Sequence, residues 1–252
     1  MKNSIEVINL SKSYKTKKAV NNISFKIDEN EIVGLLGPNG CGKTTTIGMI
    51  LGLLKPTSGQ VLINGKNIEN NKISILHKMN FISPYIELPK KLTVKQNLIV
   101  YGKLYNIKNL NERINFLSEK LRLGDLLDKI TGELSSGQKN RVSLAKALIN
   151  DPTVLLLDEP TAALDPETAD FIRTFLEKLR EEKKISVLLA SHNMDEVKRL
   201  CNSVMMMKDG NIVDGGTPED LIKKYGQKNL EEVFLEIVRK DKWILQEYTD
   251  YF

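Results

Sequence analysis

The run GPNGCGKT, from Gly37 to Thr44, constrains this chain more than any other feature. It matches the pattern G-x-x-x-x-G-K-[ST] at every fixed position, and this pattern forms a phosphate-binding loop between a strand and a helix. The apolar segment EIVGLLG before it predicts a buried strand, and TTTIGMILGLL after it predicts the helix. These flanks disfavour the alternative, a glycine-rich turn that binds nothing. The expected ligand is a nucleoside triphosphate.

The composition of this loop indicates how the phosphates would be held. The glycines allow the backbone N–H groups to face an anion, and the helix N-terminus adds a partial positive charge. Lys43 is expected to reach the β- and γ-phosphates, and Thr44 to bind Mg²⁺ through its hydroxyl. The residues expected at the nucleotide are Gly37, Pro38, Asn39, Gly40, Cys41, Gly42, Lys43, Thr44 and Thr45.

An acidic pair follows a second apolar run, VLLLDEP, from Val154 to Pro160. Four apolar residues before Asp158 predict a strand buried on both faces, with the carboxylate at its C-terminal end, where open α/β sheets bind ligands. Asp158 provides hard oxygen ligands suited to Mg²⁺. Glu159 is placed to orient or deprotonate an attacking water. As pure structure, a buried acidic pair would be costly.

The sequence LSSGQ, Leu134 to Gln138, precedes a helical pattern that brings Val142, Ala145, Leu148 and Ile149 to one face. Alone, a serine at this place is an ordinary helix N-cap. With the phosphate-binding loop upstream and the Asp-Glu pair downstream, a second anion site at this helix N-terminus is the favoured interpretation.

The order and spacing of these motifs resemble the ATP-binding-cassette (ABC) family over about residues 5 to 220. GPNGCGKT resembles its Walker A motif, LSSGQ its signature, and VLLLDE its Walker B motif with the catalytic glutamate. AALD, ending at Asp165, resembles the D-loop, and His192 in LLASHN resembles the switch histidine. The resemblance implies an α/β fold: a P-loop NTPase core with a mixed sheet, an antiparallel β subdomain, and a helical subdomain that carries the signature.

The resemblance also implies an ATPase that converts ATP and water to ADP and phosphate in a dimer with two ATP molecules between its subunits. Glu159, His192 and Lys43 would be catalytic, with His192 at the γ-phosphate, and Thr44 and Asp158 would bind Mg²⁺. Other nucleotide contacts would come from Tyr14, stacked on adenine, from Ser135, Ser136, Gly137 and Gln138 of the opposite copy, and from Asp165.

One departure from the family concerns a glutamine that usually begins the helical subdomain. This chain reads FISPYIELPKKLTVKQNL, which puts the expected glutamine near Ser83 or Pro84, and neither is a chemical substitute. Gln96 is expected too far along, within a helix. The role of this glutamine therefore stays unassigned.

Within the family, LPKKLTVKQNL and NLEEVFLEIV most resemble the separate ATPase subunits of bacterial ABC-2 type exporters. The expected partners are a second ATPase subunit, in a homodimer, and an integral-membrane permease. A soluble cassette that acts as an ATP-dependent switch in a non-transport assembly is the alternative. A degenerate cassette that scarcely hydrolyses ATP is a third hypothesis, motivated by the missing glutamine.

Composition agrees with a cytoplasmic α/β protein, and the resemblance implies a peripheral place on the inner face of the cell membrane through a membrane subunit. Of 252 residues 41% are hydrophobic, and the net charge of +5 does not argue for nucleic acid. Cys41 and Cys201 have no metal or disulfide spacing. Because Cys41 lies inside the phosphate-binding loop, we expect thiol alkylation to block nucleotide binding and ATP to protect.

No cleavable signal and no apolar run of roughly twenty residues is visible. The expected organisation is an ATP-binding domain over 1–216, with its helical subdomain at about 86–150, and a helical C-terminal extension over 217–252. In TPEDLI, Thr217 is the expected cap of a helix and Pro218 its first residue. The aromatic end DKWILQEYTDYF is either a helix packed on its own domain or a docking or dimer-contact tail.

Overall fold

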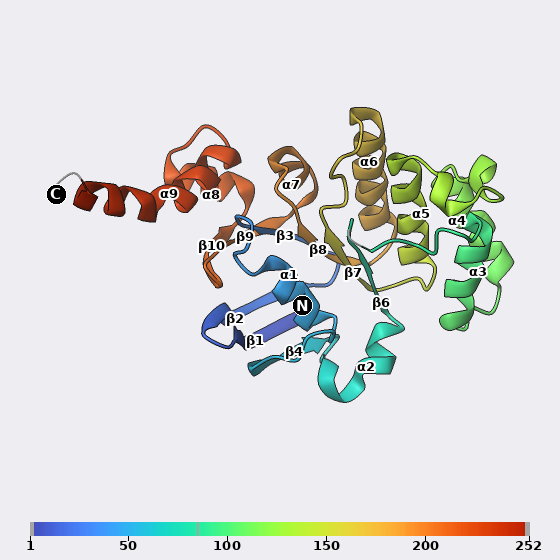
Figure 1. Cartoon of the computed structure of the whole chain (residues 1–252), viewed down its shortest axis with the longest axis horizontal. Coiled ribbons are helices and arrows are strands. Elements are labelled where there is room, and N and C mark those ends of the chain that lie inside the picture. The colour runs from blue at the N-terminus through green and yellow to red at the C-terminus, as the bar shows by residue number, and fades with distance from the viewer. Residues whose placement is uncertain (1–2, 85, 250–252) are drawn as a thin grey trace.

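The computed structural model describes residues 3–84 and 86–249, with side chains as far as Arg239 (Figure 1). These residues form two β-sheets with helices packed against them, which confirms the predicted α/β class. The larger sheet has six strands in the order β10-β9-β3-β8-β7-β6. Its members are β3 (Ile32–Leu36), β6 (Met79–Ile82), β7 (Val154–Asp158), β8 (Ser186–Ala190), β9 (Ser203–Lys208) and β10 (Asn211–Gly216).

This sheet is mixed, as predicted, because β10 pairs with β9 in the antiparallel direction whereas the other pairings are parallel. Every residue of β3, β7 and β8 is buried. Strands covered on both faces need apolar side chains in both directions, which is why their sequences are continuous apolar runs. Parallel strands also end together, so the loops that follow β3, β6, β7 and β8 lie along one edge.

The smaller sheet is antiparallel in the order β2-β1-β4-β5 and confirms the predicted β subdomain. It consists of β1 (Asn3–Tyr14), β2 (Lys17–Asp28), β4 (Ser58–Ile63) and β5 (Lys66–Asn67). Helix α1 (Lys43–Ile50) lies between the two sheets (Figure 1). Val7 of β1, Ile47 of α1 and Leu35 of β3 share one buried cluster, which joins the phosphate-binding loop to both sheets.

The opposite face of the larger sheet is covered by helices whose apolar side chains form a second cluster. Of these, α5 (Ser136–Leu148), α6 (Pro166–Glu182) and α7 (Met194–Leu200) lie over the sheet, and α3 (Val94–Leu104) and α4 (Leu110–Lys120) pack against α5. Helix α2 (Ile68–Leu76) instead lies beside the smaller sheet. Two 3₁₀ turns, Gly124–Leu126 and Thr131–Glu133, lead from α4 into α5. Helices α3, α4 and α5 form the right-hand end of the molecule in Figure 1.

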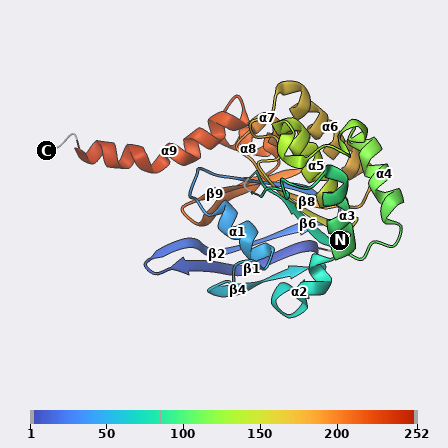
Figure 2. The ribbon, with the colours of Figure 1, turned by 45° about the vertical axis from the view of Figure 1, so that its right-hand side comes forward.

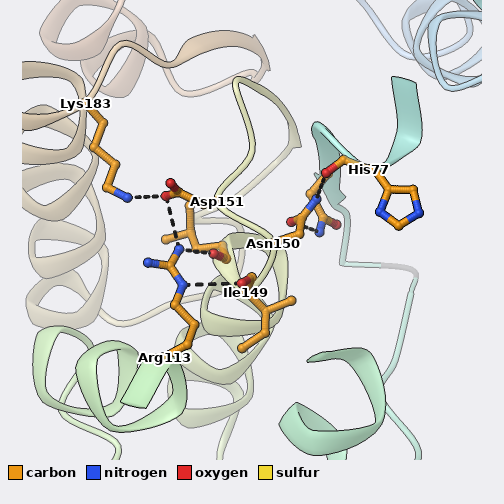
Figure 3. Close-up of polar contacts among 8 residues, drawn as sticks. His77, Arg113, Ile149, Asn150, Asp151 and Lys183 are labelled. Carbon is orange, nitrogen blue, oxygen red and sulfur yellow. Dashed lines mark hydrogen bonds and ion pairs between the residues drawn. The ribbon is translucent and has the colours of Figure 1, made fainter. Parts of the chain in front are cut away.

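The turn between α5 and β7 joins this helical region to the larger sheet (Figure 3). Arg113 of α4 donates to the carbonyl oxygens of Leu148 and Ile149 at the end of α5, and it also contacts Asp151. Lys183, just after α6, contacts the same carboxylate. Asn150, which precedes Asp151, donates to the carbonyl oxygen of His77 and accepts from Asn80. The turn therefore contacts α4, the end of α6 and the segment around the start of β6.

The chain ends in α8 (Pro218–Tyr225) and α9 (Leu230–Thr249). As predicted, Thr217 caps α8 and proline opens it. Leu230, Val233 and Ile237 of α9 are buried, and the helix then extends away from the rest of the chain (Figures 1 and 2). The side chains of the aromatic end, 241–252, lie outside the described residues. Within the described part of the chain, no helix is both long and apolar enough to span a membrane.

A candidate nucleotide-binding and hydrolysis site

A cleft of about 330 Å³ opens where β1, the phosphate-binding loop and β7 meet. It brings together residues that are far apart in the sequence and that the motifs predicted separately. The side chains and backbone that line it are those of Tyr14, Lys17, Ala19, Asn39, Gly40, Gly42, Lys43, Thr44, Thr45, Asp158 and Glu159. Tyr14 is 47% exposed at the end of β1, which leaves a ring face available for stacking.

The phosphate-binding loop uses glycine where other residues would not fit. Gly40 and Gly42 have φ values of 79° and 115°. A Cβ on Gly42 would lie 2.5 Å from the carbonyl oxygen of Ala19. Lys43 opens α1, and its ammonium donates to the carbonyl oxygens of Gly37 at 2.5 Å and Pro38 at 3.1 Å. The loop therefore gathers a cation and backbone N–H groups at one helix N-terminus, an arrangement suited to phosphate.

The Cys41 side chain points away from this cleft. Its thiol is 3% exposed and belongs to the apolar cluster between the two sheets. Burial raises the pKa of the Cys41 thiol, although the Lys43 charge opposes the rise. Of the predicted nucleotide contacts, Cys41 has only its backbone to offer. A buried thiol with a raised pKa also reacts slowly, which argues against ready alkylation.

Thr44 and Asp158 line the same cleft, and their oxygens fit a magnesium ion. Thr44 is exposed to the cleft, whereas Asp158 is 4% exposed at the end of β7. Burial, followed by the neighbouring Glu159 charge, raises the pKa of Asp158, and a bound cation would favour its charged form. A hydroxyl and a carboxylate are typical protein ligands for Mg²⁺, whose remaining ligands are usually water and substrate phosphate.

Ser83, which the sequence placed near the position of the missing glutamine without assigning it a role, contacts a residue of this site. Strand β6 pairs with β7 in parallel, with Ile82 beside Leu157, so the next residues, Ser83 and Asp158, also lie side by side. The Ser83 hydroxyl donates to Oδ2 of Asp158 at 3.4 Å. Gln96, in contrast, lies in α3 as predicted, where its side chain accepts from the Thr93 N–H in a capping box.

Glu159 and His192 are in contact, which the sequence did not predict. Nδ1 of His192 lies 2.7 Å from Oε1 of Glu159, and the His192 N–H donates to Oε2 at 3.4 Å. The Glu159 backbone N–H donates to the carbonyl oxygen of Ala190 at the end of β8. Glu159 has a φ of 50°, a left-handed conformation that is strained for a residue with a Cβ. Such strain is concentrated at functional sites, where neighbouring contacts enforce it.

The LSSGQ motif lies outside this cleft. Ser135 is the N-cap of α5 and forms a capping box with Gln138, so both polar side chains serve the helix end. Ser136 is exposed and lines a second groove of about 230 Å³, which Ser83 and Glu159 also line. Gly137 allows α5 to approach α6, because a Cβ there would lie 3.0 Å from the Thr168 side chain. Within one chain, the structure does not bring this motif to the phosphate-binding loop.

Asp165 also lies outside the cleft, as the N-cap of α6. Its carboxylate accepts from the Thr168 N–H at 2.9 Å. This hydrogen bond lowers the pKa of Asp165 below its ordinary value. Because Asp165 does not line the cleft of its own chain, it could contact nucleotide only in another copy.

A strand, a glycine-rich loop and a helix, in the same sheet as a parallel strand that ends at Asp158 and is followed by Glu159, define the fold of a P-loop NTPase. The family comparison is more specific. The sequence model for the ABC transporter family matches residues 20–162. This chain belongs to that family, as an ABC transporter ATP-binding domain.

Curated relatives include the ABC transporter ATP-binding protein NatA of Bacillus subtilis, 34% identical over 88% of this chain and 91% of that protein. The Nod factor export ATP-binding protein I of Burkholderia lata is 35% identical over 87% and 72%. The choline transport ATP-binding protein OpuBA of Bacillus subtilis is 35% identical over 89% of this chain, which spans 60% of its length.

Solved structures show the same fold. An ATP-binding subunit of an ABC transporter superposes with a TM-score of 0.84 and 27% sequence identity. The match covers 92% of this chain and 98% of that one. The agreement extends over nearly all of that subunit.

Proposed function

We propose that this chain is the ATP-binding and ATP-hydrolysing subunit of an ABC exporter, and that it drives transport through a separate membrane subunit. The observation that carries the proposal is the contact between Glu159 and His192 beside the cleft lined by Lys43, Thr44 and Asp158. A structural acidic residue does not need a strained backbone and an exposed imidazole partner. Water activation beside a bound triphosphate does account for this arrangement.

Each of these groups has a defined task in hydrolysis. Lys43 and the N–H groups of the loop bind and orient the phosphates, and Tyr14 stacks on the base. Thr44 and Asp158 hold Mg²⁺, which when bound neutralises charge on the phosphate oxygens. Glu159 accepts a hydrogen bond from the attacking water, and His192 holds Glu159 in place and lies near the γ-phosphate.

A second copy of this chain completes each site in this proposal. The exposed Ser136 at the start of α5 lies outside the cleft of its own chain, although a helix N-terminus is an anion site. In a homodimer, Ser135, Ser136, Gly137 and Gln138 of one copy would face the ATP held by the other. Asp165 would lie at the same junction.

The remaining assignments concern organisation and place. We propose an ATP-binding unit over 1–216, with 86–150 as its helical subdomain, and an appended helical extension over 217–252. The unit would lie on the cytoplasmic face of the cell membrane, bound to an integral-membrane permease. Nucleic acid has no part in the proposal.

Export rather than import is the finer part of the proposal. It is supported by the export role in the name of the Burkholderia lata relative and by the stretches LPKKLTVKQNL and NLEEVFLEIV. The relatives also include a choline transport protein of equal identity, so the direction needs its own measurement.

The decisive test of hydrolysis is Glu159→Gln in the purified full chain. We expect the variant to lose ATP hydrolysis by about a hundredfold or more, as for loss of a general base, and to keep ATP binding. Glu181→Gln, a surface change on α6, is the matched control and should hydrolyse ATP normally. Equal rates for Glu159→Gln and the unchanged chain would exclude the assignment.

The transport role needs the native partner. We expect a tagged chain, purified from gently solubilised membranes, to carry a multi-span protein in stoichiometric amount that stimulates its ATP hydrolysis. Recovery only in the soluble fraction, with a soluble assembly, would replace the transport role by that of an ATP-dependent switch.

A further inference from the structure

A buried carboxylate lies behind the hydrolysis site. Glu196, in the first turn of α7, is 0% exposed. Burial raises the pKa of Glu196, while hydrogen bonds from two hydroxyls and the charge of Arg173 oppose the rise. A buried carboxyl group costs free energy unless it is matched, so its presence here needs an explanation.

Its two hydrogen-bond donors come from the loops that carry the proposed catalytic pair. Thr161 Oγ1 donates to Oε1 of Glu196 at 2.8 Å, and Ser191 Oγ donates to Oε2 at 2.7 Å. Both serine and threonine are buried, at 1% and 7% exposed. Thr161 comes two residues after Glu159, and Ser191 comes immediately before His192. One carboxylate therefore bridges the loop after β7 and the loop after β8.

Other hydrogen bonds also hold the backbone of this region. Strands β7 and β8 pair as far as Asp158 and Ala190, and α7 has its own N-cap, because Asn193 accepts from the Glu196 N–H. Ser191 Oγ also accepts from the Asn193 N–H at 3.1 Å. What the carboxylate adds is a fixed spacing between two loops whose strands already hold them roughly in place.

We propose that Glu196 is a positioning residue for ATP hydrolysis: it ties the two loops together and so maintains the contact between Glu159 and His192. This inference rests on the proposed function and deepens it. Glu196 does not touch the nucleotide. It acts through Thr161 and Ser191, and small misplacements of reacting groups have large effects on rate.

The main test is Glu196→Gln, which preserves the shape of the side chain. Its amide NH₂ cannot accept the hydrogen bond that one of the two hydroxyls donates. We expect kcat to fall about tenfold to a hundredfold, while the dissociation constant for ATP stays within about twofold. Asp195→Asn removes a charge from the exposed neighbour in the same helical turn and should leave both quantities unchanged.

The hydroxyl donors provide variants that leave Glu196 in place. Thr161→Val and Ser191→Ala should each lower kcat with little change in ATP binding, and they keep the test decisive if Glu196→Gln folds poorly. Combined with Glu159→Gln, the Glu196→Gln change should cause no further loss, because residues that act as a unit are not additive.

Three outcomes separate the two claims. If Glu159→Gln hydrolyses ATP like the unchanged chain, the proposed function fails. If Glu159→Gln is inactive but Glu196→Gln, Thr161→Val and Ser191→Ala match Asp195→Asn in kcat, only the positioning role fails. If the Glu196 and hydroxyl variants lower ATP affinity and kcat in parallel with thermal stability, Glu196 is merely structural and the inference is overturned.

Discussion

Glu159 shows how a single residue can be held in an unfavourable conformation. Glu159 has a positive φ although it lacks the conformational freedom of glycine. Its backbone N–H is hydrogen-bonded to β8, and its carboxylate contacts His192. A left-handed conformation of this kind costs on the order of 1 kcal/mol for a residue with a Cβ. The neighbouring contacts set the direction of its carboxylate, which is the property that activation of water requires.

Ser83 is expected to influence the magnesium site through Asp158. Ser83→Ala removes the hydroxyl that lowers the pKa of this carboxyl group, so the charged form becomes less favourable. We expect the Mg²⁺ concentration needed for half-maximal binding of a fluorescent ATP analogue to rise about tenfold, as for other groups behind metal ligands. Ser74→Ala, on the exposed α2, is the control. Unchanged Mg²⁺ dependence in Ser83→Ala would contradict the role.

We expect burial in the fold, more than bound ATP, to protect Cys41 from alkylation. Because burial raises the pKa of both Cys41 and Cys201, we expect iodoacetamide to modify the folded chain slowly at either thiol and rapidly only after denaturation. Mass spectrometry of digested samples checks this. Rapid modification of Cys41 that ATP prevents would instead support the expectation from its place in the motif.

The sequence predicted those site residues whose roles come from local motifs. Lys43 and Thr44 are adjacent in a pattern with a known shape, and the buried strand before Asp158 determines where that carboxylate lies. The sequence placed Ser83 near the missing glutamine but did not predict its contact with Asp158, and it did not identify Glu196, because each acts through residues on another strand or loop. Their partners follow from strand register and helix packing, which a local pattern does not contain.

At the scale of elements, the prediction from the sequence was correct for the start of one helix and wrong for the end of another. The Thr-Pro pair before α8 predicted its start correctly. The apolar run after Thr44 suggested a longer α1 than the structure has, since the helix ends at Ile50. Gly52 has a φ of 64°, a left-handed residue that commonly terminates a helix, and Leu53 beyond it is 66% exposed. The predicted helix was too long because the prediction followed the apolar pattern and did not treat Gly52 as a helix end.

Arg113 is expected to stabilise the C-terminal end of α5. It donates to two carbonyl oxygens there that lack partners within the helix. Arg113→Met keeps an apolar stem but removes both charge-assisted hydrogen bonds, although the Leu148 carbonyl oxygen keeps the backbone N–H of Asp151. We therefore expect the free energy of unfolding to fall by about 1–3 kcal/mol. Urea denaturation measures the change. Lys120→Met, a more exposed change on the same helix, should cost under about 1 kcal/mol, and similar losses for both would contradict this role.

Asp151 gives the same turn a predictable response to acid. Burial raises its pKa, but the hydrogen bond and charge of Lys183 and the charge of Arg113 outweigh burial and leave the pKa below its ordinary value. A lowered pKa in the folded state adds stability above about pH 4, and this stability is lost as the pH falls through the folded value. The stability of Asp151→Asn should therefore fall less steeply than that of the unchanged chain as the pH drops below about 4. An unchanged acid titration would contradict this.

At the scale of the whole molecule, the separation of LSSGQ from the cleft makes a strong prediction about mixed dimers. Lys43→Ala should inactivate the loop of one chain, and Ser136→Glu should place a repelling charge at the signature of another. A dimer of one copy of each retains one site with both parts intact. We expect the mixture to regain up to about a quarter of the unchanged hydrolysis rate, assuming random pairing and independent sites.

Each variant alone provides the control for this experiment and should remain inactive after mixing with itself. A mixture as inactive as its parts would contradict composite sites. Hydrolysis by Ser136→Glu alone would show that the signature serine is not needed.

The turn after α5 also affects how this protein can be divided. A boundary at residue 150 falls between Asn150, which is bound to the segment before β6, and Asp151, which is bound to α4 and to the end of α6. A chimera that exchanges the helical region at this point would separate Asn150 from His77 and Asn80, and Arg113 from Asp151. To remain a working unit, the transplanted region would have to bring His77, Asn80 and Asp151 with it. The helical region can therefore be recombined among relatives only together with this part of the core.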